Sequence, residues 1–109
     1  MLNISDANHS AMARVAFVRR LAAMLLDAGT IRPEASRDEL LAVVAILLDE
    51  GEARGIRTER LLGMYVLLRV SDQIEPFDDP AFAQVLNDPA LSEPDKAHRL
   101  QMLRVERIG

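Results

Sequence analysis

The stretch from Leu40 to Leu48 constrains the fold of this chain more than any other feature. Its nine residues, Leu-Leu-Ala-Val-Val-Ala-Ile-Leu-Leu, contain no charge, whereas acidic and basic residues flank them on both sides. A helix that is apolar on every side is either buried by its neighbours or crosses a membrane. A bilayer needs about 20 apolar residues, so this stretch is too short to cross one. It therefore predicts a central core helix wrapped by other helices.

The amino-acid composition favours an all-α fold. Hydrophobic residues make up 50% of the 109 residues but aromatic residues only 4%, so the core must be built from Leu, Val, Ile, Met and Ala. Leu, Met and Ala are good helix formers. The length suits one domain with a real core. We therefore expect residues 1–109 to form a single domain, a compact bundle of four to five helices.

A first helix is expected from a cap at Ser5 or Asp6 to about Ala28, where Gly29 would end it. Its apolar residues recur at helical spacing, which predicts that one face of the helix points inward. The residues predicted on this inward face are Phe17, Leu21, Met24 and Ala28, with Val18 and Leu25 beside them.

Capping residues and helix breakers mark the later helices. Ser36 is expected to cap a central helix that continues to Arg54 and ends at Gly55, and Ile56 is placed for the hydrophobic contact that accompanies a glycine cap. Thr58 is expected to cap a third helix. The remaining signals are Asp79-Pro80, which opens a short helix, Asn87-Asp88-Pro89, which breaks it, and Ser92, which caps the last helix.

No residue pattern points to catalysis, a cofactor or a metal ion. The two histidines, His9 and His98, lie far apart in the sequence, whereas metal sites bring several ligands together. The chain has no cysteine, which excludes a thiol nucleophile, a disulfide and a Cys-ligated zinc site. We therefore predict a non-enzymatic protein without catalytic, cofactor-binding or metal-binding residues. Groups that distant segments bring together in space are left open.

The charge balance argues against a nucleic-acid partner. The formal net charge is −4, whereas nucleic-acid binding needs clustered positive charge. A helix-turn-helix around Gly55 is an alternative, but the third helix is too apolar to read a DNA groove. The N-terminus lacks a basic start followed by an apolar run, so we expect no signal peptide, no membrane association and a cytoplasmic location.

The segment from Asp72 to Asp95 carries seven acidic residues, four of the five prolines and neither lysine nor arginine. One interpretation is a solvated connection in which Asp79 and Ser92 cap helices. The other is a docking face for a partner that carries basic groups. The spacing of the acids does not match an EF-hand calcium loop.

The third helix is also apolar on nearly every side, and a small domain has difficulty burying two such helices. An exposed apolar surface on it would indicate a protein partner. Tyr65 has two interpretations, a core ring whose hydroxyl reaches a polar partner at the rim, or a contact residue at an interface. The candidate partner-binding residues are Met64, Tyr65, Leu68, Asp72, Glu75, Phe77, Asp78 and Asp79.

The order of several motifs over residues 48–103 resembles that of a known group of proteins. The motifs are Gly55-Ile56-Arg57-Thr58-Glu59, Tyr65, Phe77-Asp78, Leu86-Asn87-Asp88-Pro89, Leu91-Ser92 and Lys96. The group consists of small helical proteins encoded beside type VI secretion effector and spike genes in Gram-negative bacteria. This chain lacks the glycine that the group has before Phe77 and the tryptophan that it has before Leu86.

The resemblance implies a cytoplasmic binding protein that accompanies a secreted effector as a chaperone or adaptor. The alternative is an immunity protein that neutralises a cognate toxin, to which it would present the acidic segment. In either case the expected partner is another protein. Self-association of the chain is left open.

Overall fold

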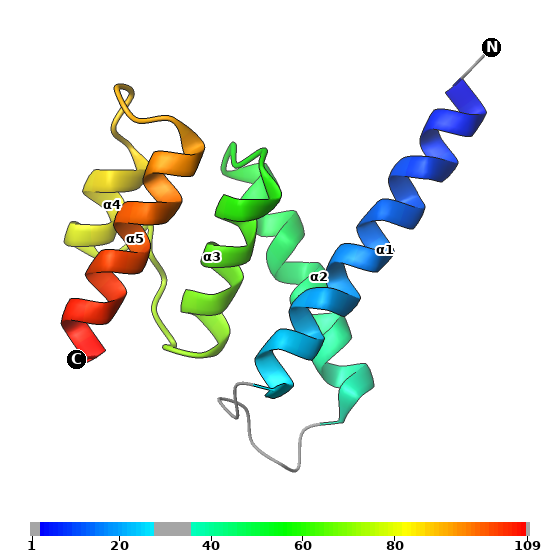
Figure 1. The fold of residues 1–109 in the computed structure, drawn as a ribbon, viewed down its shortest axis with the longest axis horizontal. Coiled ribbons are helices and arrows are strands. Elements are labelled where there is room, and N and C mark those ends of the chain that lie inside the picture. The colour runs from blue at the N-terminus through cyan, green and yellow to red at the C-terminus, as the bar shows by residue number, and fades with distance from the viewer. Residues whose placement is uncertain (1–2, 28–35, 109) are drawn as a thin grey trace. The chain divides into compact units, whose positions relative to one another are not determined.

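The computed structural model describes residues 3–27 and 36–108. In these residues all regular structure is helical, which confirms the all-α fold class (Figure 1). The chain divides into two compact units, Met1–Ala45 and Ile46–Gly109. The single compact bundle expected for the whole chain therefore stays a prediction. The helices are α1 (Asn3–Asp27), α2 (Arg37–Ala53), α3 (Glu59–Val70), α4 (Pro80–Leu86) and α5 (Glu93–Ile108).

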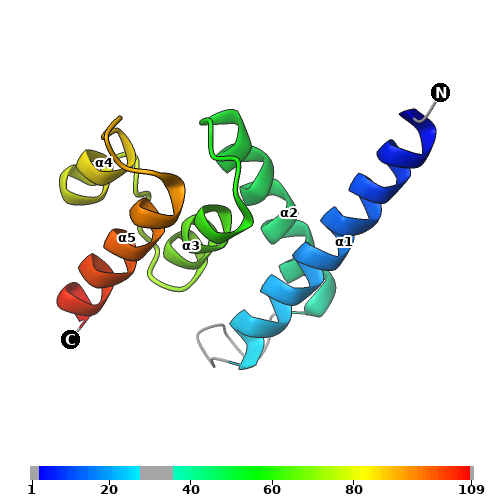
Figure 2. The same ribbon diagram turned by 45° about the horizontal axis from the view of Figure 1, so that its top comes forward.

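In the first unit, α1 lies beside the first turns of α2 in both Figure 1 and Figure 2. Helix α1 begins at Asn3, so the capping role expected of Ser5 or Asp6 is wrong. The inward orientation predicted for Met24 is also wrong, since its side chain is 57% exposed. The reason is that the buried stripe is centred on Leu21 and Leu25, so Met24 lies at its edge. The predicted end of this helix at Ala28 and Gly29 lies outside the described residues. The buried residues of α1 are Phe17, Val18, Leu21, Ala22 and Leu25.

Helix α2 begins as predicted, because the Glu39 N–H donates a hydrogen bond to Ser36 Oγ over 3.1 Å. The expectation that the apolar stretch of α2 is wrapped on all sides is wrong. Val43 is 44% exposed and Ile46 58% exposed. Burial follows one stripe at helical spacing, so one side of α2 is buried and apolar residues are exposed on the other side. The buried residues of this stripe are Leu40, Val44, Leu47 and Leu48.

The turn from α2 to α3 has the predicted glycine cap. Gly55 has a φ of +96°, a left-handed conformation that glycine adopts without steric strain. The Gly55 N–H donates to the Glu52 carbonyl over 3.0 Å and the Ile56 N–H to the Gly51 carbonyl over 3.1 Å, which are the two hydrogen bonds of a Schellman motif. Ile56 is 4% exposed, so the hydrophobic contact expected beside this cap is confirmed.

Helix α3 packs closely against the end of α2. A Cβ atom at Gly51 would lie 2.8 Å from Leu62 Cδ2 and 3.3 Å from Tyr65 Cδ2, so a larger residue there would force the Leu62 side chain to shift. Thr58 caps α3 as predicted, since its Oγ1 accepts a hydrogen bond from the Leu61 N–H over 3.3 Å. Helix α3 ends at Val70, ahead of Gln73, which has a left-handed backbone with a φ of 55°. Its buried residues are Leu61, Leu62, Tyr65, Val66 and Leu68.

Helix α5 packs against both α3 and α4, which places it in the middle of these three helices (Figure 2). Asp79 caps α4 by accepting from the Ala81 N–H over 3.1 Å, and Ser92 Oγ accepts from the Asp95 N–H over 3.3 Å. Both caps were predicted from the sequence. The core between these helices consists of Phe82, Leu86, Ala97 and Leu100 together with the buried face of α3.

Candidate protein-binding surface

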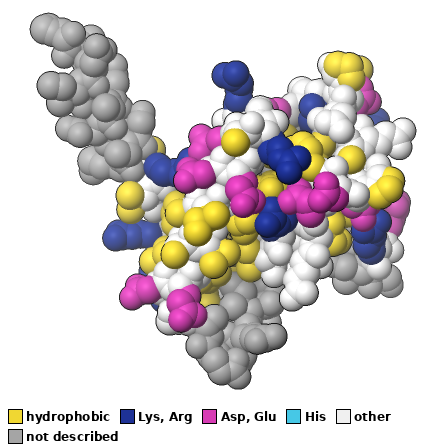
Figure 3. Space-filling model, turned by 180° about the vertical axis from the view of Figure 1, so that it is seen from behind, with side chains coloured by type: hydrophobic (Ala, Val, Ile, Leu, Met, Phe, Trp, Pro, Cys, Tyr) yellow, Lys and Arg dark blue, Asp and Glu magenta, His cyan; other side chains and the backbone are white. Residues whose placement is uncertain are grey.

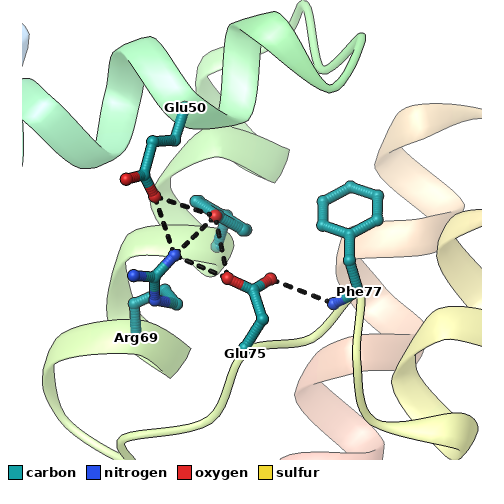
Figure 4. A network of polar contacts seen from close by, with 5 residues as sticks. Glu50, Arg69, Glu75 and Phe77 are labelled. Carbon is teal, nitrogen blue, oxygen red and sulfur yellow. Dashed lines mark hydrogen bonds and ion pairs between the residues drawn. The ribbon is translucent and has the colours of Figure 1, made fainter.

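Arg69 lies at the centre of a polar network that joins α2, α3 and the segment after α3 (Figure 4). Its Nη1 atom is 2.8 Å from Glu50 Oε2, 2.6 Å from Glu75 Oε2 and 2.8 Å from the Tyr65 hydroxyl. The second oxygen of Glu75 accepts a hydrogen bond from the Phe77 N–H over 3.1 Å. One guanidinium group therefore fixes two carboxylates and the start of the acidic segment.

Tyr65 contributes only its hydroxyl to this network. Its side chain is 1% exposed, and the hydroxyl lies 3.3 Å from Glu75 Oε2 and 3.4 Å from Glu50 Oε2. Burial and the negative charge of Glu75 raise the pKa of Tyr65, against the opposing effect of Arg69. The interpretation of Tyr65 as a core ring with a polar partner at the rim is confirmed.

Three of the seven acidic residues of the acidic segment form ion pairs with arginines of this chain. The carboxylate of Asp72 is bound by Arg104 and that of Asp79 by Arg107, both from α5. The Arg107 guanidinium holds the pKa of Asp79 below its ordinary value, and the N–H groups of Ala81 and Phe82 act in the same direction against the effect of burial. On the face drawn in Figure 3, acidic side chains likewise lie beside basic ones. The basic partners of these three residues are thus supplied by α3 and α5.

Glu93, in the first turn of α5, caps the start of α3. Its carboxylate accepts hydrogen bonds from the Arg57 N–H over 3.0 Å, from the Thr58 N–H over 2.7 Å and from the Thr58 hydroxyl over 2.7 Å. Burial by itself raises the pKa of Glu93, but these hydrogen bonds outweigh it, and the net pKa is lowered. No local sequence signal indicates this contact, because it joins residues 35 and 36 positions apart.

The structure separates the candidate partner-binding residues predicted from the sequence. Leu68 is 0% exposed and Tyr65 is 1% exposed, so neither side chain is accessible to a partner in this structure. They are buried because the apolar face of α3 packs against α5 and the end of α2. Arginines of this chain form ion pairs with the carboxylates of Asp72, Glu75 and Asp79.

Three of the predicted residues reach the surface. Asp78 is exposed, and Met64 and Phe77 are half-buried. The centre of the Phe77 ring is 5.9 Å from the centre of the Tyr65 ring and 4.8 Å from the guanidinium carbon of Arg54. Phe77 thus already has two partners within this chain, which leaves Met64 and Asp78 as accessible positions from the predicted set.

A surface that the sequence analysis missed lies between α4 and α5. A hollow of about 620 Å³ opens there, and its wall includes both apolar and charged side chains. On α5, Met102 is 52% exposed and Val105 is 55% exposed. The residues that line the hollow are Ala81, Gln84, Val85, Asp88, Leu91, His98, Arg99, Met102, Leu103 and Glu106.

We define the α5 face as His98, Arg99, Met102, Val105 and Glu106. All five side chains are exposed, and their spacing of three and four residues places them on one side of the helix. A signal for this face is present in the sequence, since two apolar residues lie there at helical spacing among charged or polar ones. The signal is weaker than that of α3, whose apolar residues are more numerous.

The described residues contain no group of three or more His, Asp or Glu side chains that could hold a metal ion. In the same part of the chain, none of the helices combines the length and the apolarity needed to cross a bilayer. Comparisons of the chain with protein-family models, with curated proteins and with solved structures find no match.

Proposed function

We propose that this chain is a non-enzymatic accessory protein that binds another protein through the α5 face and the neighbouring hollow. The observation that carries the proposal is the exposure of Met102 and Val105 beside a hollow of about 620 Å³. Large apolar side chains that border a concave surface with a polar rim are typical of protein-binding sites. The charged and polar side chains of His98, Arg99 and Glu106 provide that rim.

The proposed partner is a secreted effector of the type VI system, for which this chain would act as a cytoplasmic chaperone or adaptor. The order of motifs over residues 48–103 supports this assignment by its resemblance to proteins encoded beside effector and spike genes. An all-helical surface also suits a helical partner segment, because a helix satisfies its own backbone hydrogen bonds and needs no exposed strand to pair with.

An immunity role is the second candidate, but the ion pairs do not favour it. That role relied on an acidic face offered to a toxin, and Asp72, Glu75 and Asp79 already bind Arg104, Arg69 and Arg107. A toxin would have to displace these arginines in order to use the same carboxylates. We therefore place the adaptor role first.

The test is affinity capture from the native host followed by mass spectrometry, with three baits. Wild type and Gln101→Asp should enrich the same protein, because Gln101 is exposed but lies outside the α5 face. Met102→Asp should lose that protein, because a carboxylate would replace an apolar contact residue. An effector or spike protein that shows this pattern supports the adaptor role.

Two results would contradict the proposal. Equal enrichment by the wild-type and Met102→Asp baits would remove the α5 face as the binding surface. Enrichment of no effector or spike protein would remove the type VI assignment. Circular dichroism of the three baits provides the control for folding.

A further inference from the structure

We infer that the α5 face is self-complementary and binds the same face of a second copy of this chain. The two α5 helices would run antiparallel about a two-fold axis near Met102. This inference concerns the surface used in the proposed function, but it requires no effector and is tested on the purified chain alone.

The first observation is the spacing of exposed residues along α5. Positions 95, 98, 102 and 105 alternate by three and four, which is the pattern of a helix that packs along the side of another helix. Met102 and Val105 are the apolar residues in this row, and both are about half exposed. The opposite side of α5 is already covered, since Ala97 is 2% exposed and Leu100 is 0% exposed.

The second observation is how the charges of α5 are used. Arg104 and Arg107 are bound by Asp72 and Asp79 of the same chain. Arg99 and Glu106, in contrast, have no ion-pair partner among the residues that the structure describes. The α5 face thus presents one unpaired positive charge and one unpaired negative charge, on either side of Met102.

A two-fold axis converts this pattern into complementarity. In an antiparallel pair centred on Met102, a residue that precedes the centre faces a residue that follows it by about the same number of positions. Arg99 precedes Met102 by three positions and Glu106 follows it by four. The difference of one residue corresponds to about 1.5 Å along the helix, which the long side chain of arginine can span. Each dimer would therefore contain two Arg99–Glu106 ion pairs.

The two-fold axis also brings apolar groups together. Met102 of one copy would lie against Met102 of the other, because the axis places the central residue opposite itself. The same rotation places the α4 side of one copy opposite the α4 side of the other. The two hollows, whose walls contain Val85, Leu91 and Leu103, would therefore face each other beside the Met102 contact.

The size of the surface predicts a weak dimer. Ten residues line the hollow, whereas a standard interface contains about 20–30 residues on each side. We therefore expect an equilibrium between monomer and dimer that depends on protein concentration, with a dissociation constant in the micromolar range or above.

The experiment is analytical ultracentrifugation of the full chain at low salt, from low micromolar to near-millimolar concentration. Arg99→Glu places two carboxylates opposite each other, and Glu106→Arg places two guanidinium groups opposite each other. Each single variant should raise the dissociation constant at least about tenfold, because like charges then meet twice in every dimer. The matched control is Arg60→Glu, the same change at an exposed position on α3, which should leave the dissociation constant unchanged.

Two further samples test the two-fold arrangement itself. The double variant Arg99→Glu with Glu106→Arg should restore the wild-type dissociation constant. An equimolar mixture of the two single variants should form a mixed dimer, because all unlike charges then face each other. These samples also show that the single variants are folded, since an unfolded chain could not regain binding.

Three results would overturn the inference: a wild-type chain that stays monomeric over the whole concentration range, a dimer that neither single variant weakens, or a double variant that fails to recover. A monomeric wild type would leave the capture experiment for the effector unaffected. Loss of effector capture would, in turn, leave a measured dimer standing.

Discussion

Arg104 donates two hydrogen bonds to the carboxylate of Asp72, from Nε to Oδ2 over 2.6 Å and from Nη2 to Oδ1 over 3.2 Å. The Asp72 side chain is 8% exposed, so its charge is largely removed from water. The planar guanidinium matches both carboxylate oxygens, which a lysine ammonium group cannot do. This pair joins α5 to the segment that follows α3.

We expect Arg104→Lys to lower the free energy of unfolding by about 1–3 kcal/mol, because one of two charge-assisted hydrogen bonds to a buried carboxylate is lost. Chemical denaturation measured by circular dichroism tests this. The control is Arg99→Lys, the same change at an exposed arginine on the same helix, which should have little effect. An equal, small loss in both variants would mean that the Asp72–Arg104 pair does not stabilise the fold.

Shortening a side chain to alanine should change the free energy of unfolding by different amounts on the two sides of α2. Leu48 is 0% exposed, and we expect Leu48→Ala to cost about 2–5 kcal/mol through lost burial and the cavity left behind. Ile46 is 58% exposed, and Ile46→Ala should change stability by less than about 0.5 kcal/mol. Both variants can be measured by urea denaturation. A cost above about 2 kcal/mol at Ile46 would show that the outer side of α2 is covered in solution.

The lowered pKa of Glu93 predicts that the free energy of unfolding depends on pH. Its pKa is lower in the folded protein than in the unfolded chain, so its contribution is present above the unfolded pKa of about 4.3 and is lost as the pH falls through the folded pKa. The free energy of unfolding of the wild type should therefore fall on acidification more steeply than that of Glu93→Gln. Denaturation curves between neutral and acidic pH test this. Parallel pH profiles for the two proteins would contradict the role given to the Glu93 carboxylate.

Gln73 should gain stability from a change to glycine. A left-handed backbone costs a residue with a Cβ atom about 1–2 kcal/mol, of which the greater flexibility of glycine in the unfolded chain cancels a part. We expect Gln73→Gly to raise the melting temperature, by a net gain of about 0.5–1 kcal/mol. The matched control is Gln84→Gly inside α4, where the same change should lose about 1 kcal/mol. Losses at both positions would show that the Gln73 backbone is not strained.

The starts of α2, α3, α4 and α5 were predictable because their signals are local, whereas the start of α1 was not. Ser36, Thr58, Asp79 and Ser92 each accept a hydrogen bond from a backbone N–H two or three residues further along. Gly55 likewise ends α2 through bonds that reach back no more than five residues. Such contacts depend only on residues that are neighbours in the sequence.

The candidate site was harder to predict, because it depends on contacts between distant residues. The sequence shows no basic residue within the acidic segment, and only the fold shows that Arg104 and Arg107 form ion pairs with Asp72 and Asp79. The apolar run of α2 could not show which side faces outward, since Val43 and Val44 are chemically alike but differ in exposure, at 44% and 0%. A hydrophobic pattern identifies residues that can be buried, whereas packing decides which of them are.

The capping of α3 by Glu93 has a consequence for the order in which the second unit assembles during translation. Glu93, Arg104 and Arg107 bind groups that lie between 28 and 36 residues earlier in the chain. Because the chain is synthesised from its N-terminus, α3 and α4 emerge from the ribosome before these three residues do. Arg69 can reach Glu50 and Glu75 at that stage. The start of α3, Asp72 and Asp79 gain their partners only when α5 is available. The nascent second unit therefore exposes the apolar face of α3 to chaperones until α5 has also emerged from the ribosome.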